Sequence, residues 1–156
     1  MIKVIKQIIS KLKNKKLSVA FAESCTGGML SQIITSVNGA SKVFTFSVIT
    51  YSNQSKIKFL KVPSGILKKY GSVSRECCSS MVSNLAKISK AKLNLAITGV
   101  AGPTGGTKQK PVGLVFIGIK RNKKIKISKY LFKNQNRKNI RINSVKKSLK
   151  LIEEFI

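Results

Sequence analysis

The chain has 156 residues, of which 42% are hydrophobic, and it carries a formal net charge of +27. This length and apolar content fit one folded domain, predicted to span residues 1–156, and exclude a disordered polyelectrolyte, which pairs high charge with low hydrophobicity. Histidine and aspartate are absent. Their absence excludes a Ser-His-Asp triad and most metal sites, so we expect no metal and no cofactor.

The basic residues are 27 lysines and 4 arginines, spread from Lys3 to Lys150. Clustered basic side chains bind nucleic acid by releasing counterions from phosphates, and such sites favour arginine. The even spread of lysine, together with abundant isoleucine and asparagine, instead favours drift in an A+T-rich genome. We therefore expect nucleic acid to bind only non-specifically, through charge.

Three cysteines, Cys25, Cys77 and Cys78, show neither a disulfide framework nor the spacing of a zinc site. Lysines interrupt every apolar run of the basic segment 1–16, so this segment fits neither a signal peptide nor a membrane span. These features predict a cytoplasmic protein that does not enter a membrane.

Hydrophobic periodicity predicts alternating helices and strands along the chain. In order, we expect a helix over 2–14, a strand over 17–22, a helix over 29–37, a strand over 43–51, a helix over 52–60, a helix over 74–90 capped by Ser74, strands over 93–98, 112–120 and 124–132, and a helix over 136–155. This order predicts an α/β fold, a three-layer α/β/α sandwich with a mixed, mostly parallel sheet of about five strands.

The first segment that could carry chemistry is Ala-Glu-Ser-Cys-Thr-Gly-Gly at 22–28, between a strand and a helix. Such a turn places a side chain beside free backbone N–H groups, where an oxyanion is stabilised, so Ser24 fits a nucleophile. Ser24 also fits a plain helix cap, with the glycines allowing close packing. Spacing alone favours the cap.

The second such segment is Gly-Val-Ala-Gly-Pro-Thr-Gly-Gly at 99–106, which also follows a strand. Its glycines would let backbone N–H groups approach a phosphate or sugar, although a flexible connector explains the same composition. Two glycine-rich loops that follow different strands of one sheet would line the same edge, which predicts a pocket for a small molecule.

A serine nucleophile needs a base, and the candidates in this chain are lysines, tyrosines and four glutamates. A lysine serves only when it is neutral, which requires burial or a nearby positive charge. Composition does not select one lysine among 27.

Five motifs follow one another along the chain: AESCTGG at 22–28, TYSN at 50–53 with Lys56, GSVS at 71–74, TGVAGPTGG at 98–106 and KPVG at 110–113. In this order they resemble the CinA C-terminal domain family, whose stand-alone members are nicotinamide-nucleotide amidohydrolases. The resemblance runs from about residue 3 to the last helix.

The resemblance implies a three-layer α/β/α sandwich with a mixed sheet. It also implies metal-free hydrolysis of the carboxamide of nicotinamide mononucleotide, giving nicotinate mononucleotide and ammonia. Ser24 matches the nucleophile, Lys56 the base, and Arg137 the arginine that completes the site. Arg137 would either keep Lys56 neutral by like-charge repulsion or bind the substrate phosphate.

The backbone N–H groups after Ser24 would hold the oxyanion, and Cys25 is a rival nucleophile that ranks lower, as a small packed residue. The resemblance implies further substrate-binding positions around this nucleotide site. These are Thr26, Gly27, Gly28, Tyr51, Ser52, Asn53, Thr98, Gly99, Gly102, Gly105, Gly106 and Arg141.

The chain departs from the family pattern at two places. Thr104 stands where an acidic residue is usual, and the turn from Phe132 to Arg137 lacks the family's glycine and is one residue longer. Larger relatives carry an N-terminal nucleotide-processing domain, whose activities we expect to be absent. A homodimer is a further family-level expectation.

Two other hypotheses stay open from the sequence. The chain could be an inactive or repurposed nucleotide-binding relative, or a basic protein associated with nucleic acid.

Overall fold

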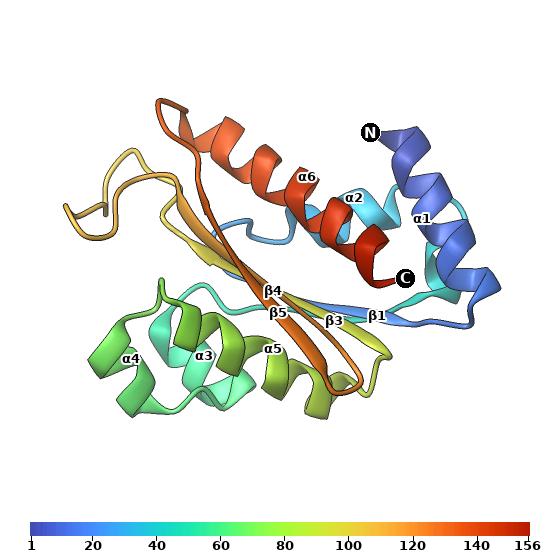
Figure 1. The fold of residues 1–156 in the computed structure, drawn as a ribbon, viewed down its shortest axis with the longest axis horizontal. Helices are drawn as coiled ribbons and strands as arrows, with labels where there is room; N and C mark the ends of the chain where they lie inside the picture. Colours follow the sequence, from blue (N-terminus) through green and yellow to red (C-terminus); the bar gives the residue numbers. More distant parts are fainter.

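Strands and helices alternate through the computed structural model, which describes residues 1–156 (Figure 1). In chain order the elements are α1 (Ile2–Asn14), β1 (Val19–Glu23), α2 (Met29–Thr35), the 3-10 turn η1 (Ala40–Lys42), β2 (Phe44–Ile49), α3 (Asn53–Leu60), α4 (Ser64–Tyr70), α5 (Arg75–Ser89), β3 (Leu93–Gly99), β4 (Leu114–Arg121), β5 (Lys124–Leu131) and α6 (Arg137–Phe155). None of the helices combines the length and hydropathy needed to cross a bilayer.

The five strands form one mixed sheet in the order β2-β1-β3-β4-β5. β1 pairs in parallel with both β2 and β3, whereas β4 runs antiparallel to β3 and to β5, so four of the five strands share one direction. Helices α1, α2 and α6 cover one face of the sheet, and α3, α4 and α5 cover the other (Figure 1). The predicted three-layer α/β/α sandwich is confirmed.

Side-chain size differs between the two faces of the central strands. Phe21 of β1 points into the larger hydrophobic core, beneath α1, α2 and α6, whereas Ala20 and Ala22 face the smaller core beneath α5. Ala96 on β3 and Gly118 on β4 continue this small-residue surface. Because successive side chains of a strand alternate between faces, the sequence of β1 sets both layers at once and lets α5 lie close to the sheet.

The predicted elements are found with shifts of at most two residues at their ends, and Ser74 caps α5 as expected, its Oγ accepting a hydrogen bond from the Cys77 N–H. Helix α4 was not predicted, because its short segment directly follows Pro63 and helices commonly end before a proline. In the structure Pro63 occupies the N-cap position of α4, where its missing N–H is not needed.

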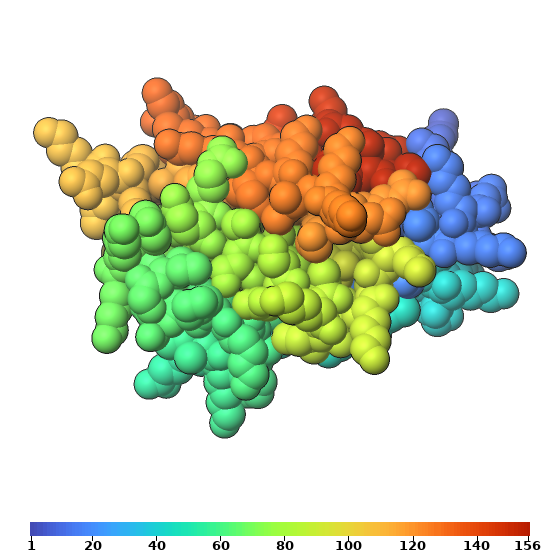
Figure 2. Space-filling view, turned by 60° about the horizontal axis from the view of Figure 1, so that its bottom comes forward, coloured from blue at the N-terminus to red at the C-terminus, as the bar shows by residue number.

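The parallel strands β1, β2 and β3 all end at the same edge of the sheet. The segments that follow them, 24–28, 50–52 and 100–113, therefore meet there, and α6 begins above this edge (Figure 1). The glycine-rich part of segment 100–113 projects beyond the body of the molecule (Figure 2). The topology thus brings together the two loops that the sequence singled out.

Gly99 ends β3 where this strand lies against β4, and it allows a test of the close packing at this edge. A Cβ at Gly99 would lie 2.7 Å from a Val115 methyl group and 2.8 Å from the Leu114 carbonyl oxygen. We expect Gly99→Ala to lower the free energy of unfolding by about 1–3 kcal/mol, because backbone atoms must move to admit the methyl group.

Urea denaturation measures this change. Gly65→Ala is the matched control, because nothing lies within 4 Å of a Cβ at Gly65 in α4. An alanine there is expected to stabilise the helix by about 0.5–1 kcal/mol. Equal stability of the two variants would contradict the close packing described for Gly99.

Candidate active site

A serine and a lysine that lie 32 positions apart in the sequence meet at the carboxyl edge of the parallel strands. Lys56 Nζ lies 2.9 Å from Ser24 Oγ and donates a hydrogen bond of 2.7 Å to the carbonyl oxygen of Thr50. Lys56 is 1% exposed and Ser24 7% exposed. No other lysine of the chain is buried, so the tertiary structure selects one lysine where composition did not.

Helix α3 aims Lys56 at this position through the way it begins. Ser52 is the N-cap, and its hydroxyl accepts a hydrogen bond from the Ser55 N–H while Ser55 Oγ accepts one from the Ser52 N–H. This capping box fixes the first turn of the helix. Lys56 follows one residue later, so its side chain extends back toward the end of β1.

Burial lowers the pKa of Lys56, because the low-polarity surroundings disfavour the ammonium form. Cys25 and Cys77 would oppose this shift only as thiolates. Burial raises the pKa of Cys25 to about 12 and that of Cys77 to about 11, so both thiols stay neutral at pH 7. In the neutral amine, an N–H is donated to Thr50 and the lone pair is left for the Ser24 hydroxyl.

A cavity of about 140 Å³ opens onto the Ser24–Lys56 pair. Small-molecule sites commonly measure about 300–1,000 Å³, so this cavity fits the reacting end of a ligand rather than a whole nucleotide. Its lining comes from every loop at this edge and from α6: Ser24, Cys25, Tyr51, Lys56, Ser72, Val73, Thr98, Gly99, Ala101 and Arg137.

Arg137, the first residue of α6, joins two loops at the rim of the cavity. Its guanidinium donates one hydrogen bond of 2.8 Å to the Gly102 carbonyl and one of 2.7 Å to the Tyr51 hydroxyl. Arg137 is not among the groups that shift the pKa of Lys56. Burial, and not like-charge repulsion from Arg137, therefore lowers the pKa of Lys56. Of the two roles considered for Arg137, phosphate binding is the one that is left.

Glu23, and not Ser24 as the sequence spacing favoured, caps the helix that follows the turn. Gly28 is the N-cap of α2, and the carboxylate of Glu23 accepts hydrogen bonds from the N–H groups of Gly28, Leu30 and Ser31. The interpretation of Ser24 as a helix cap is thus wrong. Glu23, which sequence reasoning named only as one available carboxylate, takes that place.

The backbone N–H groups of Cys25 and Thr26 follow directly after Ser24 and donate to no backbone carbonyl. The Cys25 N–H interacts with its own thiol, which opposes the rise in the pKa of that thiol. Gly27 then adopts a left-handed conformation (φ +58°), which an L side chain would strain. The turn thus leaves two N–H groups without a carbonyl acceptor directly after the serine.

Several predicted ligand positions line the cavity or support it. Tyr51 and Gly99 contribute to the lining, and Gly102 holds Arg137 through its carbonyl. Thr98 also lines the cavity, while its hydroxyl donates a 2.8 Å hydrogen bond to the Ser72 carbonyl.

Other predicted ligand positions lie outside the cavity lining. Ser52 caps α3, and Asn53 is exposed in the first turn of that helix. Gly105 and Gly106 belong to the loop between β3 and β4 and do not line the cavity.

Four more positions, in the nucleophile turn and in α6, do not line the cavity. Thr26, Gly27 and Gly28 belong to the turn and do not line the cavity. Arg141 donates a 2.7 Å hydrogen bond to the Thr26 carbonyl. It therefore braces the back of the turn from α6.

Sequence reasoning missed Ser72, Val73, Ala101 and the Thr50 carbonyl as parts of the site. The motif at 71–74 was a signal for the first two. Thr50 stands in the motif at 50–53, but its side chain gave no sign of its role, because it acts through a backbone oxygen that every residue type carries.

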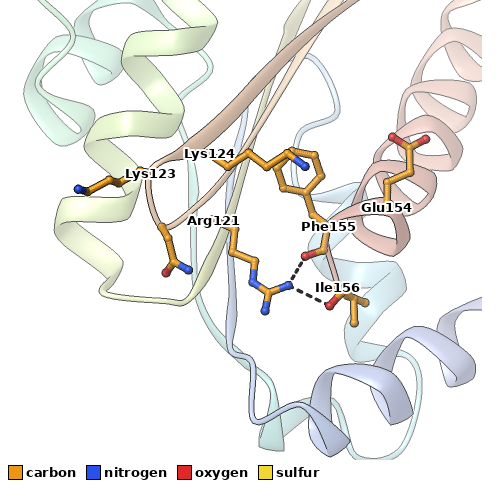
Figure 3. A pocket seen from close by; sticks show the side chains of 7 residues that line it. Arg121, Lys123, Lys124, Glu154, Phe155 and Ile156 are labelled. Carbon is orange, nitrogen blue, oxygen red and sulfur yellow. Dashed lines mark hydrogen bonds between the residues drawn. The ribbon is translucent and has the colours of Figure 1, made fainter.

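The largest cavity, about 630 Å³, lies at the opposite edge of the sheet, beside the β4–β5 turn and the end of α6 (Figure 3). There Arg121 donates hydrogen bonds of 2.6 and 2.9 Å to the carbonyls of Phe155 and Ile156. These bonds satisfy the last carbonyls of a helix, which is a structural role. No three histidine, cysteine, aspartate or glutamate side chains gather anywhere as a metal site.

Fold and site together define an α/β protein with a buried serine–lysine pair at the carboxyl edge of its parallel strands. The sequence matches the family described as the CinA C-terminal domain over residues 1–156, and the chain belongs to that family.

Curated relatives agree with this assignment. The chain is 42% identical over 149 residues to a putative competence-damage inducible protein of Thermoanaerobacter pseudethanolicus, covering 96% of this chain and 36% of the relative. It is 46% identical over 141 residues to a CinA-like protein of Endomicrobium trichonymphae, covering 90% of this chain and 32% of that protein. The chain thus spans about a third of the length of these relatives.

Solved structures show the same architecture. The competence/damage inducible protein CihA of Agrobacterium tumefaciens superposes with a TM-score of 0.96 at 32% identity, covering 98% of this chain and 93% of that one. A competence or damage-inducible protein of Enterobacter asburiae gives 0.94 at 26% identity, covering 99% and 98% of the two chains.

The buried amine should leave a pH signature on stability. Because burial lowers the pKa of Lys56 in the folded state, the unfolded chain binds more protons than the folded chain between this lowered pKa and the ordinary lysine pKa of about 10.4. The stability of the wild type should therefore rise with pH across this window, relative to a Lys56→Met variant that has no titrating group there.

Urea denaturation of both proteins between about pH 6 and pH 10 measures this difference. Lys58→Met, on the exposed side of the same helix, is the control and should show no such trend. A pH-independent difference between the wild type and Lys56→Met would contradict the assignment of a lowered pKa.

Proposed function

We propose that this chain hydrolyses the carboxamide of nicotinamide mononucleotide, giving nicotinate mononucleotide and ammonia, with Ser24 as nucleophile and Lys56 as base. The observation that carries the proposal is the 2.9 Å approach of Lys56 Nζ to Ser24 Oγ in a buried cavity. Both residues stand at the positions of the family motifs.

The reaction begins with proton transfer inside the pair. Neutral Lys56 takes the proton of the Ser24 hydroxyl, and the serine oxygen attacks the amide carbon of the substrate. The Thr50 carbonyl holds Nζ in place by accepting one N–H, which favours the orientation of the lone pair toward Ser24. Burial supports this step because it lowers the pKa of Lys56 and so disfavours the ammonium form.

The tetrahedral intermediate needs hydrogen-bond donors for its oxyanion. The N–H groups of Cys25 and Thr26 are the candidates, since they follow Ser24 and donate to no backbone carbonyl. Of these two residues, Cys25 lines the cavity. Loss of one such donor in other hydrolases costs roughly 3–4 kcal/mol of transition-state stabilisation.

Collapse of the intermediate completes the acylation. The C–N bond breaks, protonated Lys56 gives its proton to the departing nitrogen, and ammonia leaves. Lys56, neutral again, takes a proton from a water molecule that attacks the ester carbon of the acyl-enzyme. Nicotinate mononucleotide departs as Ser24 regains its proton.

The ribose phosphate would lie outside the small cavity, at the rim formed by Tyr51, Arg137 and the glycine-rich loop. A guanidinium there can pair with a phosphate in two hydrogen bonds. Cys25 is the less favoured nucleophile, because burial raises the pKa of its thiol to about 12 and Lys56 contacts the serine.

The proposal places the protein in the cytoplasm, where its three free, buried thiols suit a reducing environment. The homodimer remains a prediction. So does the expectation that nucleic acid binds only through charge.

Ammonia release from nicotinamide mononucleotide tests the proposed reaction. We expect Ser24→Ala to lower kcat by at least about 10³-fold and Lys56→Ala to lower it nearly as much, because the dyad acts as a unit. Cys25→Ala should keep most of the activity. Activity lost in Cys25→Ala but kept in Ser24→Ala would reassign the nucleophile, and a wild type without activity would favour a repurposed nucleotide-binding protein.

Arg137 offers a test of phosphate binding. We expect Arg137→Lys to raise KM by about tenfold or more with a smaller effect on kcat, because lysine cannot replace the forked guanidinium. Arg75→Lys is the control, since Arg75 is exposed and donates to the Ile127 carbonyl away from the site. An unchanged KM in Arg137→Lys would exclude this role.

A further inference from the structure

Glu23 is a completely buried carboxylate next to the serine, and the proposed chemistry does not use it. It is the last residue of β1, a strand held on both sides by β2 and β3. Neither salt bridge of the chain involves Glu23. A buried negative charge without a cation is costly, so its contacts require an explanation.

Four hydrogen bonds satisfy both oxygens of this carboxylate. Oε2 accepts from the N–H groups of Gly28 and Leu30, each at 3.1 Å. Oε1 accepts from the Ser31 N–H at 2.9 Å and from the Ser31 hydroxyl at 2.7 Å. Since the Ser31 hydroxyl has given its only proton to Glu23, it accepts one from Ser47, 2.7 Å away. All four partners of Glu23 are donors, which is the pattern of an ionised carboxylate.

The backbone of Glu23 is tied to the base as well. Its carbonyl accepts a 2.8 Å hydrogen bond from the Thr50 N–H, and the carbonyl of Thr50 holds Lys56 Nζ. The N–H of Ser24 donates a 3.0 Å hydrogen bond to the Ile97 carbonyl. Glu23 thus connects Thr50, whose carbonyl holds Lys56, with the turn that carries Ser24.

We infer that Glu23 is a positioning residue, whose carboxylate acts as a built-in anion and fixes the turn from Ser24 to Gly28. By accepting from the N–H groups of Gly28, Leu30 and Ser31, it ties the end of β1 to the start of α2 and so fixes the turn in which the Cys25 and Thr26 N–H groups follow the serine. The inference rests on the proposed function, which it deepens.

This role excludes the start of α2 as a phosphate site, because the N–H groups that would bind a phosphate are already paired with Glu23. A substrate phosphate must bind elsewhere on the rim. Capping alone does not explain a buried charge here. A neutral serine or asparagine caps a helix at lower desolvation cost, and α2 has only seven residues.

Two measurements test the positioning role, and both use Glu23→Gln. The first is kcat and KM with nicotinamide mononucleotide. The second is the rate at which a fluorophosphonate probe labels Ser24, followed by intact mass. In that reaction the Ser24 oxygen bonds to phosphorus, the P–F bond breaks, fluoride leaves, and the serine proton passes to Lys56. The probe's phosphonyl oxygen needs the same N–H donors as the oxyanion. The labelling rate therefore reports on Ser24 and these donors even if the natural substrate is not nicotinamide mononucleotide.

We expect Glu23→Gln to lower kcat and the labelling rate by about 10²-fold, as for the loss of an oxyanion donor, with KM changed by less than about threefold. Glu76→Gln removes the same charge from an exposed position in the first turn of α5 and should match the wild type. A merely structural role would lower the folded fraction without this split between kcat and KM.

Folded Glu23→Gln with wild-type kcat and labelling would overturn the inference. If the wild type releases no ammonia but its labelling still depends on Glu23, the proposed substrate fails and the inference stands. If the wild type is neither active nor labelled at Ser24, both fail.

Ser31→Ala keeps the carboxylate and serves if Glu23→Gln does not fold. It should lower both rates by about tenfold with KM unchanged, since one of the four donors is lost. Unchanged rates in Ser31→Ala would then overturn the inference.

Discussion

The site depends on one desolvated amine. Lysine is the commonest charged residue of this chain, and 26 of its 27 copies stay in contact with water, where the ammonium form is strongly favoured. Lys56 alone is enclosed, with the Thr50 carbonyl and the Ser24 hydroxyl as its polar neighbours. No carboxylate pairs with it, so burial is not compensated and the uncharged form gains. Enclosing this side chain disfavours its ammonium form, and the neutral amine is the form that the proposed base requires.

The sheet makes this enclosure feasible. Three parallel strands end at one edge and deliver three loops to the same place, and α5 packs closely against the small side chains beneath them. Arg137 reaches over from α6 and joins the loops after β2 and β3. Glu23 joins the turn after β1 to its own helix. Each loop is thus held by a charged group whose partners lie on a neighbouring element.

The high positive charge of the chain is separate from this chemistry. Two of the four carboxylates form exposed ion pairs, Lys11–Glu153 and Lys126–Glu154. A third carboxylate, that of Glu23, is paired with backbone N–H donors instead of a lysine. The other lysines, apart from Lys56, remain at least partly exposed to solvent. The largest cavity, beside Arg121, lies at the far edge of the sheet from Ser24, so cavity size is no guide to the reactive site in this fold.

Local patterns in the sequence determined most of the architecture. Periodicity placed five strands and five of the six helices, because the alternation of apolar residues records which face each element buries. Only helix α4 was not predicted from the sequence, because a proline is found both after the end of a helix and at the beginning of one, as Pro63 is here. The ordered motifs singled out Ser24, Lys56 and Arg137. Tertiary structure decided what patterns could not: that Lys56 is the enclosed lysine, that Glu23 rather than Ser24 caps α2, and that Gly105 and Gly106 stay outside the cavity. The physical reason is that desolvation and hydrogen-bond partners arise between segments distant in the chain, whereas propensity and periodicity report only on neighbours.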